Sequence, residues 1–364
     1  MHYPTLFVPG SIAKQAFRNR IILAPMTRIS ATENGMPTET LRKYYTSFAK
    51  GGFGALISEG LYIDQTWSQT YVNQPGIASD DQAEGWKQIV HDVQQNKTLF
   101  IAQLMHAGAL SQKNIWRSET IAPSAVRPLG EQLGFYHGEG EYPLPIEMTE
   151  QQILDVIDSF ADSAERAVSV AGFNGVEIHA ANGYLLDQFL TDYSNQRNDR
   201  WGGDLTGRLT LTLEVIKAVR KRLGDKTILG VRISQGKVND FQHKWKEGEA
   251  GAKQLFSLIA EAGVDYIHVT EYKAWESAFN DNTLSLAEIA RQAAPGTTLI
   301  VNGGLDNGEL AEQVLEKGAD FVAIGKAALA NHDWPERVKN NIELDELSNA
   351  VLAPTAEIKP FEVM

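Results

Sequence analysis

Short apolar runs recur along the whole chain, and each is bounded by turn-forming residues. We identify eight of them, separated by segments with helical periodicity. Alternation of strand-like and helix-like segments implies parallel strands joined by right-handed crossovers. The pattern therefore predicts an α/β fold, a closed (β/α)8 TIM barrel. The runs are Ile21–Ala24, Ala55–Ser58, Leu99–Leu104, Val176–His179, Ile228–Ile233, Tyr266–Thr270, Thr298–Val301 and Phe321–Ile324.

The chain is longer than a bare barrel requires, and the surplus predicts three additional segments. It has 364 residues, whereas a typical barrel of this class has about 250. Residues 106–148, after the third strand, are rich in Pro, Gly and aromatic residues, which favours a lid over a disordered loop. Residues 1–20 are expected to plug the opposite end of the barrel, and residues 342–364 to form a C-terminal tail. Residues 1–364 are expected to form a single domain.

Three segments carry the signature of a helix N-terminus. Ser79, Thr149 and Asp306 are each followed three residues later by Gln or Glu. In a capping box the first side chain accepts a hydrogen bond from the backbone three residues on, and the later side chain bonds back. We therefore predict that helices begin at these three residues.

The composition excludes several kinds of chemistry. The chain has no cysteine, so it can form no disulfide, no thiolate nucleophile and no cysteine-ligated iron–sulfur cluster. Its net charge is −13 without a visible stripe of Lys and Arg, so a nucleic-acid partner is not expected. Residues 1–20 lack a signal core and no apolar run is long enough to span a membrane, which predicts a cytoplasmic protein. No metal site is expected, because His137, Glu139 and Glu141 lack a known ligand spacing.

Residues 175–187 (GVEIHAANGYLLD) begin as a buried strand with two kinds of side chain. Successive residues of a strand point to opposite faces. Val176 and Ile178 therefore share one face, and Glu177 and His179 share the other. His179 is expected to face the interior of the barrel.

The same segment then delivers three polar side chains just past the end of the strand. The strand breaks at Asn182, and Tyr184 follows where a helix must begin. The carboxyl ends of barrel strands carry the active site in this fold class. His179 and Asn182 can donate hydrogen bonds to a carbonyl oxygen there, and the phenol of Tyr184 can supply a proton. The segment therefore suggests reduction of a polarised double bond.

Two further strands end with a polar residue on the inward face. The third strand offers Gln103 and the fifth offers Arg232, while no acidic residue is evident beside these two and His179. A buried Arg needs partners, because an unpaired buried charge is costly. A planar ligand with a heteroatom-rich edge would satisfy Gln103 and Arg232 together. The alternative is a polar layer inside the barrel with a purely structural role.

Glycine pairs follow the last two strands. Gly303 and Gly304 come after the seventh strand, and Gly325 with Lys326 after the eighth. Glycines at these two places, leading into helix N-termini, form the usual phosphate site of such barrels. The spacing predicts a phosphate-bearing cofactor.

Four sequence blocks occur in a fixed order along the chain, and through them it resembles the Old Yellow Enzyme family of FMN-dependent ene-reductases from end to end. The blocks are Ala24–Arg28, Gln103–Gly108, Gly172–Gln188 with Ser194–Arg197, and Gly325–Lys326 with Asn331. The resemblance implies non-covalently bound FMN, NADPH or NADH as the reductant, and small-molecule substrates. Hydride would pass through FMN to the β-carbon of activated alkenes, namely α,β-unsaturated carbonyls, maleimides and nitroalkenes.

The resemblance also implies roles for individual residues. Thr27 would hydrogen-bond the flavin carbonyl next to N5, Gln103 would bind the pyrimidine edge, and Arg232 would lie against the N1/O2 side. Gly303, Gly304, Gly325 and Lys326 would hold the phosphate. The flavin would be lined through the main chain of Pro25, Met26 and Gly60. His179 and Asn182 would bind the activating oxygen of the substrate, and Tyr184 would donate the proton.

The chain departs from the family pattern at four positions. Met105 stands where relatives often have an aromatic residue beside the flavin, which predicts a roomier substrate pocket. Ala109 and Ile146 replace arginines that are common in the family, and Lys326 replaces another. Lys326 keeps the charge but not the bidentate geometry of Arg. The core chemistry is untouched by these changes, whereas lid docking and any oligomer contact are affected.

Two other readings compete with an ene-reductase. One is a different FMN barrel oxidoreductase, such as a hydroxy-acid oxidase or a dihydrouridine synthase, but these lack the His179-x-x-Asn182-Gly-Tyr184 block. The other is a barrel that binds phosphate sugars without flavin, which would leave Gln103 and Arg232 unexplained. The sequence is compatible with a monomer or a homo-oligomer.

Overall fold

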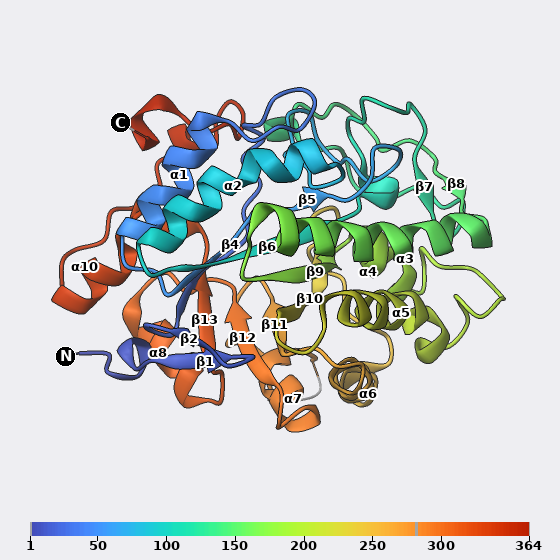
Figure 1. The fold of residues 1–364 in the computed structure, drawn as a ribbon. Helices are drawn as coiled ribbons and strands as arrows, with labels where there is room; N and C mark the ends of the chain where they lie inside the picture. The colour runs from blue at the N-terminus through green and yellow to red at the C-terminus, as the bar shows by residue number, and fades with distance from the viewer. Residues whose placement is uncertain (1, 281–282, 364) are drawn as a thin grey trace.

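The computed structural model describes residues 2–280 and 283–363, and eight strands within these ranges form a closed parallel barrel (Figure 1). Their hydrogen-bonded order is β4-β3-β13-β12-β11-β10-β9-β6, and a pairing of β4 with β6 closes the ring. The predicted TIM barrel is confirmed. The strands are β3 Ile21–Leu23, β4 Ala55–Ile57, β6 Leu99–Met105, β9 Gly175–Asn182, β10 Ile228–Lys237, β11 Tyr266–Thr270, β12 Thr298–Asn302 and β13 Phe321–Ile324.

Every barrel strand coincides with one of the eight apolar runs to within one residue at its carboxyl end, except for two strands that extend three or four residues further. β9 continues to Asn182, and β10 continues to Lys237. The register between these two strands shifts between Ile233 and Lys237, which marks an irregularity of the bulge type. The extra residues carry polar side chains to the mouth of the barrel.

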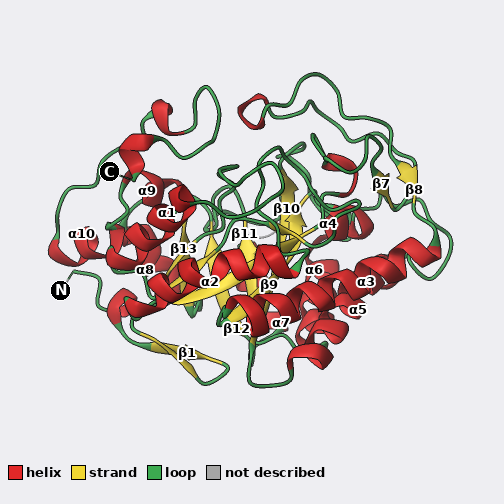
Figure 2. Ribbon diagram, turned by 45° about the horizontal axis from the view of Figure 1, so that its top comes forward, coloured by secondary structure: helices red, strands yellow, loops and turns green. Residues whose placement is uncertain are grey.

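Helices surround the strands on the outside of the barrel (Figure 2). Two of the three predicted helix starts are confirmed, because Ser79 and Thr149 accept hydrogen bonds from the backbone N–H groups of Gln82 and Gln152. The prediction for Asp306 was wrong by one residue, since Asn307 caps that helix instead. The helices are α1 Glu39–Lys50, α2 Asp80–Gln95, α3 Glu150–Glu165, α4 Leu185–Leu190, α5 Leu205–Leu223, α6 Gly248–Glu261, α7 Leu286–Ala293, α8 Gly308–Glu316, α9 Lys326–Ala330 and α10 Trp334–Asn340.

Alternation along the strands divides the apolar core into two layers. On β10, Leu229, Val231 and Ile233 belong to the large cluster that the barrel shares with the helices. Ile228 belongs to a separate cluster in the barrel interior, together with Ile300 from β12. This interior cluster occupies the lower part of the barrel, and polar residues occupy the part above it.

The N-terminal segment closes one end of the barrel. β1 Gly10–Ile12 and β2 Gln15–Phe17 form an antiparallel hairpin, which lies at the lower end of the strands (Figure 1). Ile12 and Phe17 pack into the interior cluster, and the Phe17 ring lies 4.8 Å from that of Phe321. The plug predicted for residues 1–20 is confirmed for its described part; Met1 lies outside the described residues.

The long insertion after β6 lies at the other end of the barrel, together with the C-terminal segment (Figure 1). Within the insertion, β7 Ile121–Ala122 pairs in parallel with β8 Ile146–Glu147. A further short strand, β5 Leu61–Tyr62, pairs with the end of β6. No helix in the described part of the chain is both long and apolar enough to cross a bilayer.

The C-terminal segment is fastened to the barrel by a buried ion pair. Both terminal nitrogens of the Arg28 guanidinium donate to the Glu362 carboxylate, at 2.8 and 2.7 Å, and both side chains are at most 2% exposed. The Nε of Arg28 donates to the Ala356 carbonyl at 2.9 Å, and the guanidinium lies over the Tyr44 ring. Burial alone would lower the pKa of Arg28, but Tyr44 and Glu362 together raise it. The predicted tail is therefore packed against the segment that follows β3; its last residue, Met364, lies outside the described residues.

Glu362→Ala is expected to destabilise the protein strongly, because the Arg28 cation would remain buried without its partner. The free energy of unfolding should fall by about 3–5 kcal/mol, as is typical when one member of a buried pair is removed. Urea unfolding at pH 7 measures this loss. Glu84→Ala is the matched control, because Glu84 pairs with Lys87 on the surface, and its loss should stay below about 1 kcal/mol. Equal losses in the two variants would show that the tail is not held by this pair.

Candidate active site

A charged network fills the upper interior of the barrel around Glu177. Its carboxylate accepts hydrogen bonds from the amide of Gln103 at 2.8 Å and from the Tyr266 hydroxyl at 3.0 Å. His268 Nδ1 lies 2.8 Å from the same carboxylate. Burial raises the pKa of Glu177, but His268, Arg232 and Gln103 outweigh it and leave the pKa below its usual value. The carboxylate is therefore ionised at neutral pH.

Glu177 corrects the expectation that no acidic residue accompanies Gln103, His179 and Arg232. It precedes His179 by two residues and so shares the inward face of β9. Strand register places Glu177 beside Gln103 of β6. The alternation along the strand could have shown this from the sequence, but the identity of the partners depends on register between strands.

Arg232 lies one level above, between His179 and His268 in register. Its Nη2 donates to Thr270 at 3.1 Å and to Asn302 at 2.9 Å. Its Nε is buried and has no hydrogen-bond partner in the described part of the chain. A buried donor of this kind needs an acceptor, and one edge of a planar heteroaromatic ligand would supply it.

A cavity of about 570 Å³ opens beside Arg232 at the carboxyl ends of β3, β12 and β13. Its lining includes seven of the ten residues predicted to bind the cofactor: Pro25, Met26, Arg232, Gly303, Gly304, Gly325 and Lys326. The structure therefore brings the predicted ring-binding and phosphate-binding residues together. Thr27 directly follows Met26, whereas Gly60 and Gln103 lie outside this lining.

Glycine is required at the predicted phosphate-binding turn after β12. Gly303 has φ 133° and Gly304 has φ 64°, conformations that other residues rarely adopt. A Cβ atom on Gly303 would lie 1.8 Å from the Glu271 carbonyl oxygen. At Gly325 the nearest atoms to an added Cβ lie 3.8 Å away, so the backbone there is open to the cavity. This cradle and the unpaired Arg232 Nε fit a phosphate-bearing flavin such as FMN.

His179 is held as a neutral hydrogen-bond donor. Its Nδ1 accepts the backbone N–H of Ala181 at 3.3 Å, which leaves the proton on Nε2. Burial, Arg232 and His268 together lower the pKa of His179 well below its usual value. The imidazole therefore carries no charge at neutral pH and offers one N–H.

Tyr184 lies next to His179, with ring centroids 5.0 Å apart. Its hydroxyl is 2.8 Å from the Tyr71 hydroxyl, and burial raises its pKa to about 12 against the opposing effects of Tyr71 and Arg232. The phenol therefore keeps its proton at neutral pH. Tyr71 was not predicted, because the loop after β5 carries no motif that marks it.

Aromatic residues of the insertion cover this group. Tyr142 packs in one buried cluster with Met105 and Tyr184. Tyr136 stacks on Tyr71 with ring centroids 4.3 Å apart, and its hydroxyl donates to the Thr27 carbonyl at 3.3 Å. The insertion thus contacts both the predicted catalytic residues and the predicted flavin segment, in the position expected of a lid.

Met105 is almost fully buried at the end of β6. A Cβ atom on Gly60 would lie 2.3 Å from its sulfur, so the two residues are in direct contact. Met105 therefore joins the predicted flavin-lining residue Gly60 to Tyr142 and Tyr184.

Among the described residues, no group of three or more His, Asp or Glu is arranged to hold a metal ion.

Comparison with known proteins gives matches over nearly the whole chain. Residues 5–345 match the NADH:flavin oxidoreductase / NADH oxidase family. A chanoclavine-I aldehyde reductase from Penicillium roqueforti is 33% identical over 346 residues, which are 93% of this chain and 89% of the relative. An NADH oxidase from Thermoanaerobacter brockii is 30% identical over 350 residues, 93% of this chain, and the chain spans about half (51%) of that relative's length.

The fold also matches solved structures. An Old Yellow Enzyme homologue from Zymomonas mobilis superposes with a TM-score of 0.88 at 28% sequence identity. The match covers 99% of this chain and 98% of the homologue. The likeness therefore extends to the insertion and the tail as well as the barrel.

His106 begins the insertion and supports the start of α4. Its carbonyl accepts the backbone N–H of Leu185, and its Nδ1 accepts that of Gly108 at 3.1 Å. Burial lowers the pKa of His106 to about 4, although Asp64 opposes the shift. The folded protein therefore keeps this imidazole neutral under conditions in which the unfolded chain protonates it.

His106→Gln is expected to reduce the loss of unfolding free energy that occurs as the pH falls below 7. Between pH 6.5 and about 4 the unfolded chain binds a proton at His106 that the folded chain does not, so stability falls as pH falls. From pH 7.5 to 5, the variant should lose about 2 kcal/mol less stability than the wild type. Urea unfolding at both pH values measures this difference. The exposed His91 gives the control variant His91→Gln, whose profile should match the wild type; a matching profile for His106→Gln would contradict the prediction.

Proposed function

The chain belongs to the NADH:flavin oxidoreductase / NADH oxidase family and is an oxidoreductase of the Old Yellow Enzyme type, and from this premise we propose that it reduces activated alkenes. The proposed substrates are α,β-unsaturated carbonyls, maleimides and nitroalkenes. FMN is the cofactor, and NADPH or NADH is the reductant. We also propose that residues 1–364 act as one domain and that the protein works in the cytoplasm.

The observation that carries this proposal is the pair of buried, uncharged donors His179 and Tyr184, whose ring centroids lie 5.0 Å apart, with Asn182 between them at the end of the same strand. His179 offers an imidazole N–H, Asn182 a side-chain amide, and Tyr184 a phenol. Asn182 also lines a cavity of about 390 Å³ that shares Glu271, Tyr272 and Lys273 with the larger cavity. The cavity beside Asn182 is the space proposed for the substrate, and His179 lies three residues before Asn182 on the same strand.

These donors stabilise the charge that develops during alkene reduction. FMN, when bound, supplies the hydride to the β-carbon of the substrate. Negative charge then grows on the activating oxygen, where His179 and Asn182 act as an oxyanion hole. Because both groups are neutral in the resting site, their dipoles are already oriented and no proton has to move first.

Tyr184 completes the addition by protonating the α-carbon. Its pKa of about 12 keeps the proton in place until a strongly basic carbon develops beside it. The adjacent Tyr71 hydroxyl, 2.8 Å away, can stabilise the phenolate that remains. If hydride reaches one face of the alkene, a proton from Tyr184 on the opposite face would complete a trans addition.

The proposed flavin contacts use the remaining residues of the site. Arg232 would hold the N1/O2 side of the flavin through its unpaired Nε, and Gln103, whose amide nitrogen is engaged by Glu177, would bind the pyrimidine edge through its amide oxygen. Thr27 and the main chain of Pro25, Met26 and Gly60 line the ring. If the protein were an FMN barrel with another reaction, the position of Tyr184 beside His179 would have no explanation. If it bound no flavin, the buried Arg232 Nε would have no acceptor.

The proposed phosphate site can be tested through Lys326. Lys326→Met should weaken FMN binding by about 10-fold or more, because a charge-assisted contact contributes roughly 1.5–3 kcal/mol. Titration of apoprotein with FMN measures the dissociation constant, and heat release followed by chromatography identifies the flavin. Lys339→Met, on the exposed face of α10, is the control and should bind FMN as the wild type does. Release of FAD, or of no flavin, would contradict the proposal.

Tyr184→Phe should separate the two half-reactions. Reduction of the flavin by NADPH or NADH needs no proton donor and should remain nearly intact. Turnover of simple enones should fall by about 10²–10⁴-fold, the usual contribution of a placed general acid. Nitroalkenes should suffer less, because water can protonate their nitronate product later. Stopped-flow absorbance measures each half-reaction, with Tyr3→Phe as control, because Tyr3 packs beside Gly308 of α8 and lines neither cavity. Equal losses in both half-reactions would mean that Tyr184 has a structural role only.

Met105→Trp should narrow the substrate pocket. Met105 packs against Gly60, Tyr142 and Tyr184, and the larger, rigid indole must extend toward the substrate. Turnover of hindered enones should fall while cyclohexenone is spared, and the stereochemistry of the product should change. Competition between the two enones measures the ratio of kcat/KM. Met105→Leu conserves volume and should keep the wild-type ratio. If the ratio is also unchanged in Met105→Trp, other residues form the pocket wall.

A further inference from the structure

The proposed catalytic residues Asn182 and Tyr184 flank Gly183, and these three residues, the oxygen-binding turn, have an unusual backbone. Asn182 has φ 61° and Gly183 has φ 89°. Left-handed conformations are costly for residues other than glycine and persist only where the surroundings hold them. Two contacts with β10 hold Asn182: its N–H donates to the Ser234 hydroxyl at 2.8 Å, and its carbonyl accepts the N–H of Val238 at 3.0 Å.

Gly183 is held at both ends of its backbone by side chains of α4. Its N–H donates to Oδ2 of Asp187 at 2.6 Å. Its carbonyl accepts the amide of Gln188 at 2.8 Å. A Cβ atom on Gly183 would lie 2.7 Å from Oδ1 of Asn239, so the turn cannot relax by moving toward β10. The orientation of the turn therefore depends on where the Asp187 carboxylate lies.

Lys237 fixes that carboxylate. Its Nζ lies 2.8 Å from both oxygens of Asp187, and the side chains are 3% and 0% exposed. The Thr191 hydroxyl adds a contact to Oδ1 at 3.3 Å. A carboxylate this deeply buried requires a cation, because desolvation of an unpaired charge is costly. Lys237 thus fixes the position of the Asp187 carboxylate that accepts the Gly183 N–H.

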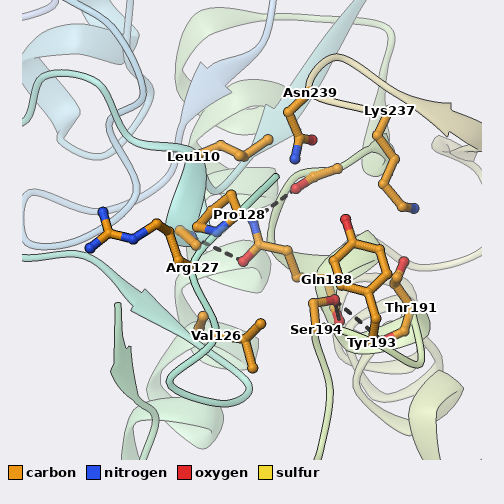
Figure 3. A pocket seen from close by; sticks show the side chains of 13 residues that line it. Leu110, Val126, Arg127, Pro128, Gln188, Thr191, Tyr193, Ser194, Lys237 and Asn239 are labelled. Atoms are coloured by element: carbon orange, nitrogen blue, oxygen red, sulfur yellow. Dashed lines mark hydrogen bonds between the residues drawn. The ribbon is translucent and has the colours of Figure 1, made fainter. Parts of the chain in front are cut away.

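The irregularity in β10 places Lys237 there. The register shift between Ile233 and Lys237 sets Lys237 opposite Asn182 on β9. Figure 3 shows Lys237, Gln188 and Asn239 around a cavity of only about 20 Å³. That volume admits about one water molecule and no substrate. These side chains therefore act on the turn and form no ligand site of their own.

We propose that the buried Asp187–Lys237 ion pair is the positioning element of the oxygen-binding turn, setting the directions from which Asn182 and Tyr184 meet the substrate oxygen and the proton-accepting carbon. The proposal rests on the proposed function of those two residues. Asp187 lines neither of the two large cavities and acts through the backbone of Gly183, whereas Lys237, which also lines the cavity beside Asn182, acts on the turn through Asp187.

Two double variants isolate the contact with Gly183 without leaving a buried charge unpaired. Asp187→Asn/Lys237→Met removes both charges but keeps an oxygen that accepts the Gly183 N–H. Asp187→Ala/Lys237→Met removes both charges and that acceptor. Any difference between the two variants therefore reports on the hold over the turn, not on the loss of charge.

Binding of p-chlorophenol to the oxidised holoprotein is the first readout, because a phenolate mimics the oxygen anion that Asn182 and His179 stabilise. Calorimetry should show at least about 10-fold weaker binding for Ala/Met than for Asn/Met, since small displacements of catalytic groups have effects of this size or larger. The oxidative half-reaction with cyclohexenone should show the same order. FMN affinity should agree in the two variants, because neither Asp187 nor Lys237 lines the cavity proposed for the flavin.

The controls separate this proposal from general destabilisation and from the proposed function. Arg220→Met breaks the Arg220–Asp265 pair at the base of the barrel and should lower Tm without changing phenol affinity. Asn182→Ala should weaken phenol binding directly, and an unchanged affinity there would overturn the proposed function itself. If Asn182→Ala weakens binding while the two double variants bind phenol equally, the turn is held by other contacts and the positioning proposal is wrong.

Discussion

The ionised Glu177 carboxylate inside the barrel is the constraint on which the rest of the site depends. A charge at that depth is tolerated only because Gln103, Tyr266 and His268 donate to it and Arg232 lies nearby. Satisfying Glu177 in turn fixes the Gln103 amide, because its nitrogen donates to that carboxylate. It also supplies the negative charge that makes a buried Arg232 acceptable. The boundary between the apolar lower interior and the polar upper interior is thus set by these charge interactions as well as by side-chain packing.

On the side of the site proposed to bind substrate, buried charged side chains fix the conformation of the backbone. The left-handed turn after β9 would relax without external contacts, and the Asp187–Lys237 pair, Gln188 and Ser234 supply them from α4 and β10. The donors proposed to meet substrate are then neutral, while the charged pair that holds the turn is buried behind it. This separation suits a reaction in which negative charge must develop on the substrate and not on the protein.

The segments outside the barrel contact both the predicted flavin-binding part of the site and the part that contains Tyr184. The insertion reaches Thr27 through Tyr136 and the proton donor through Tyr142 and the Tyr71–Tyr136 stack. The tail reaches the same β3 loop through the Arg28–Glu362 pair. A change in the insertion therefore acts on both the predicted flavin contacts and the predicted proton donor. The additional length of the chain beyond a bare barrel serves this enclosure.

The sequence by itself determined the barrel, since alternating apolar runs and helix signals depend only on local periodicity, and all eight runs became strands. It also determined which side chains stand at the strand ends: Gln103, His179, Arg232 and the glycines after β12 and β13 follow from position and residue type. It did not reveal the partners, because Tyr71 and Tyr184 are 113 residues apart, Asp187 and Lys237 are 50 apart, and Arg28 and Glu362 are 334 apart. Those pairings depend on strand register, on the irregularity in β10 and on the path of the tail, none of which has a local signature. Only the tertiary structure decided them, because burial selects a partner by distance in space and by the need to satisfy charge.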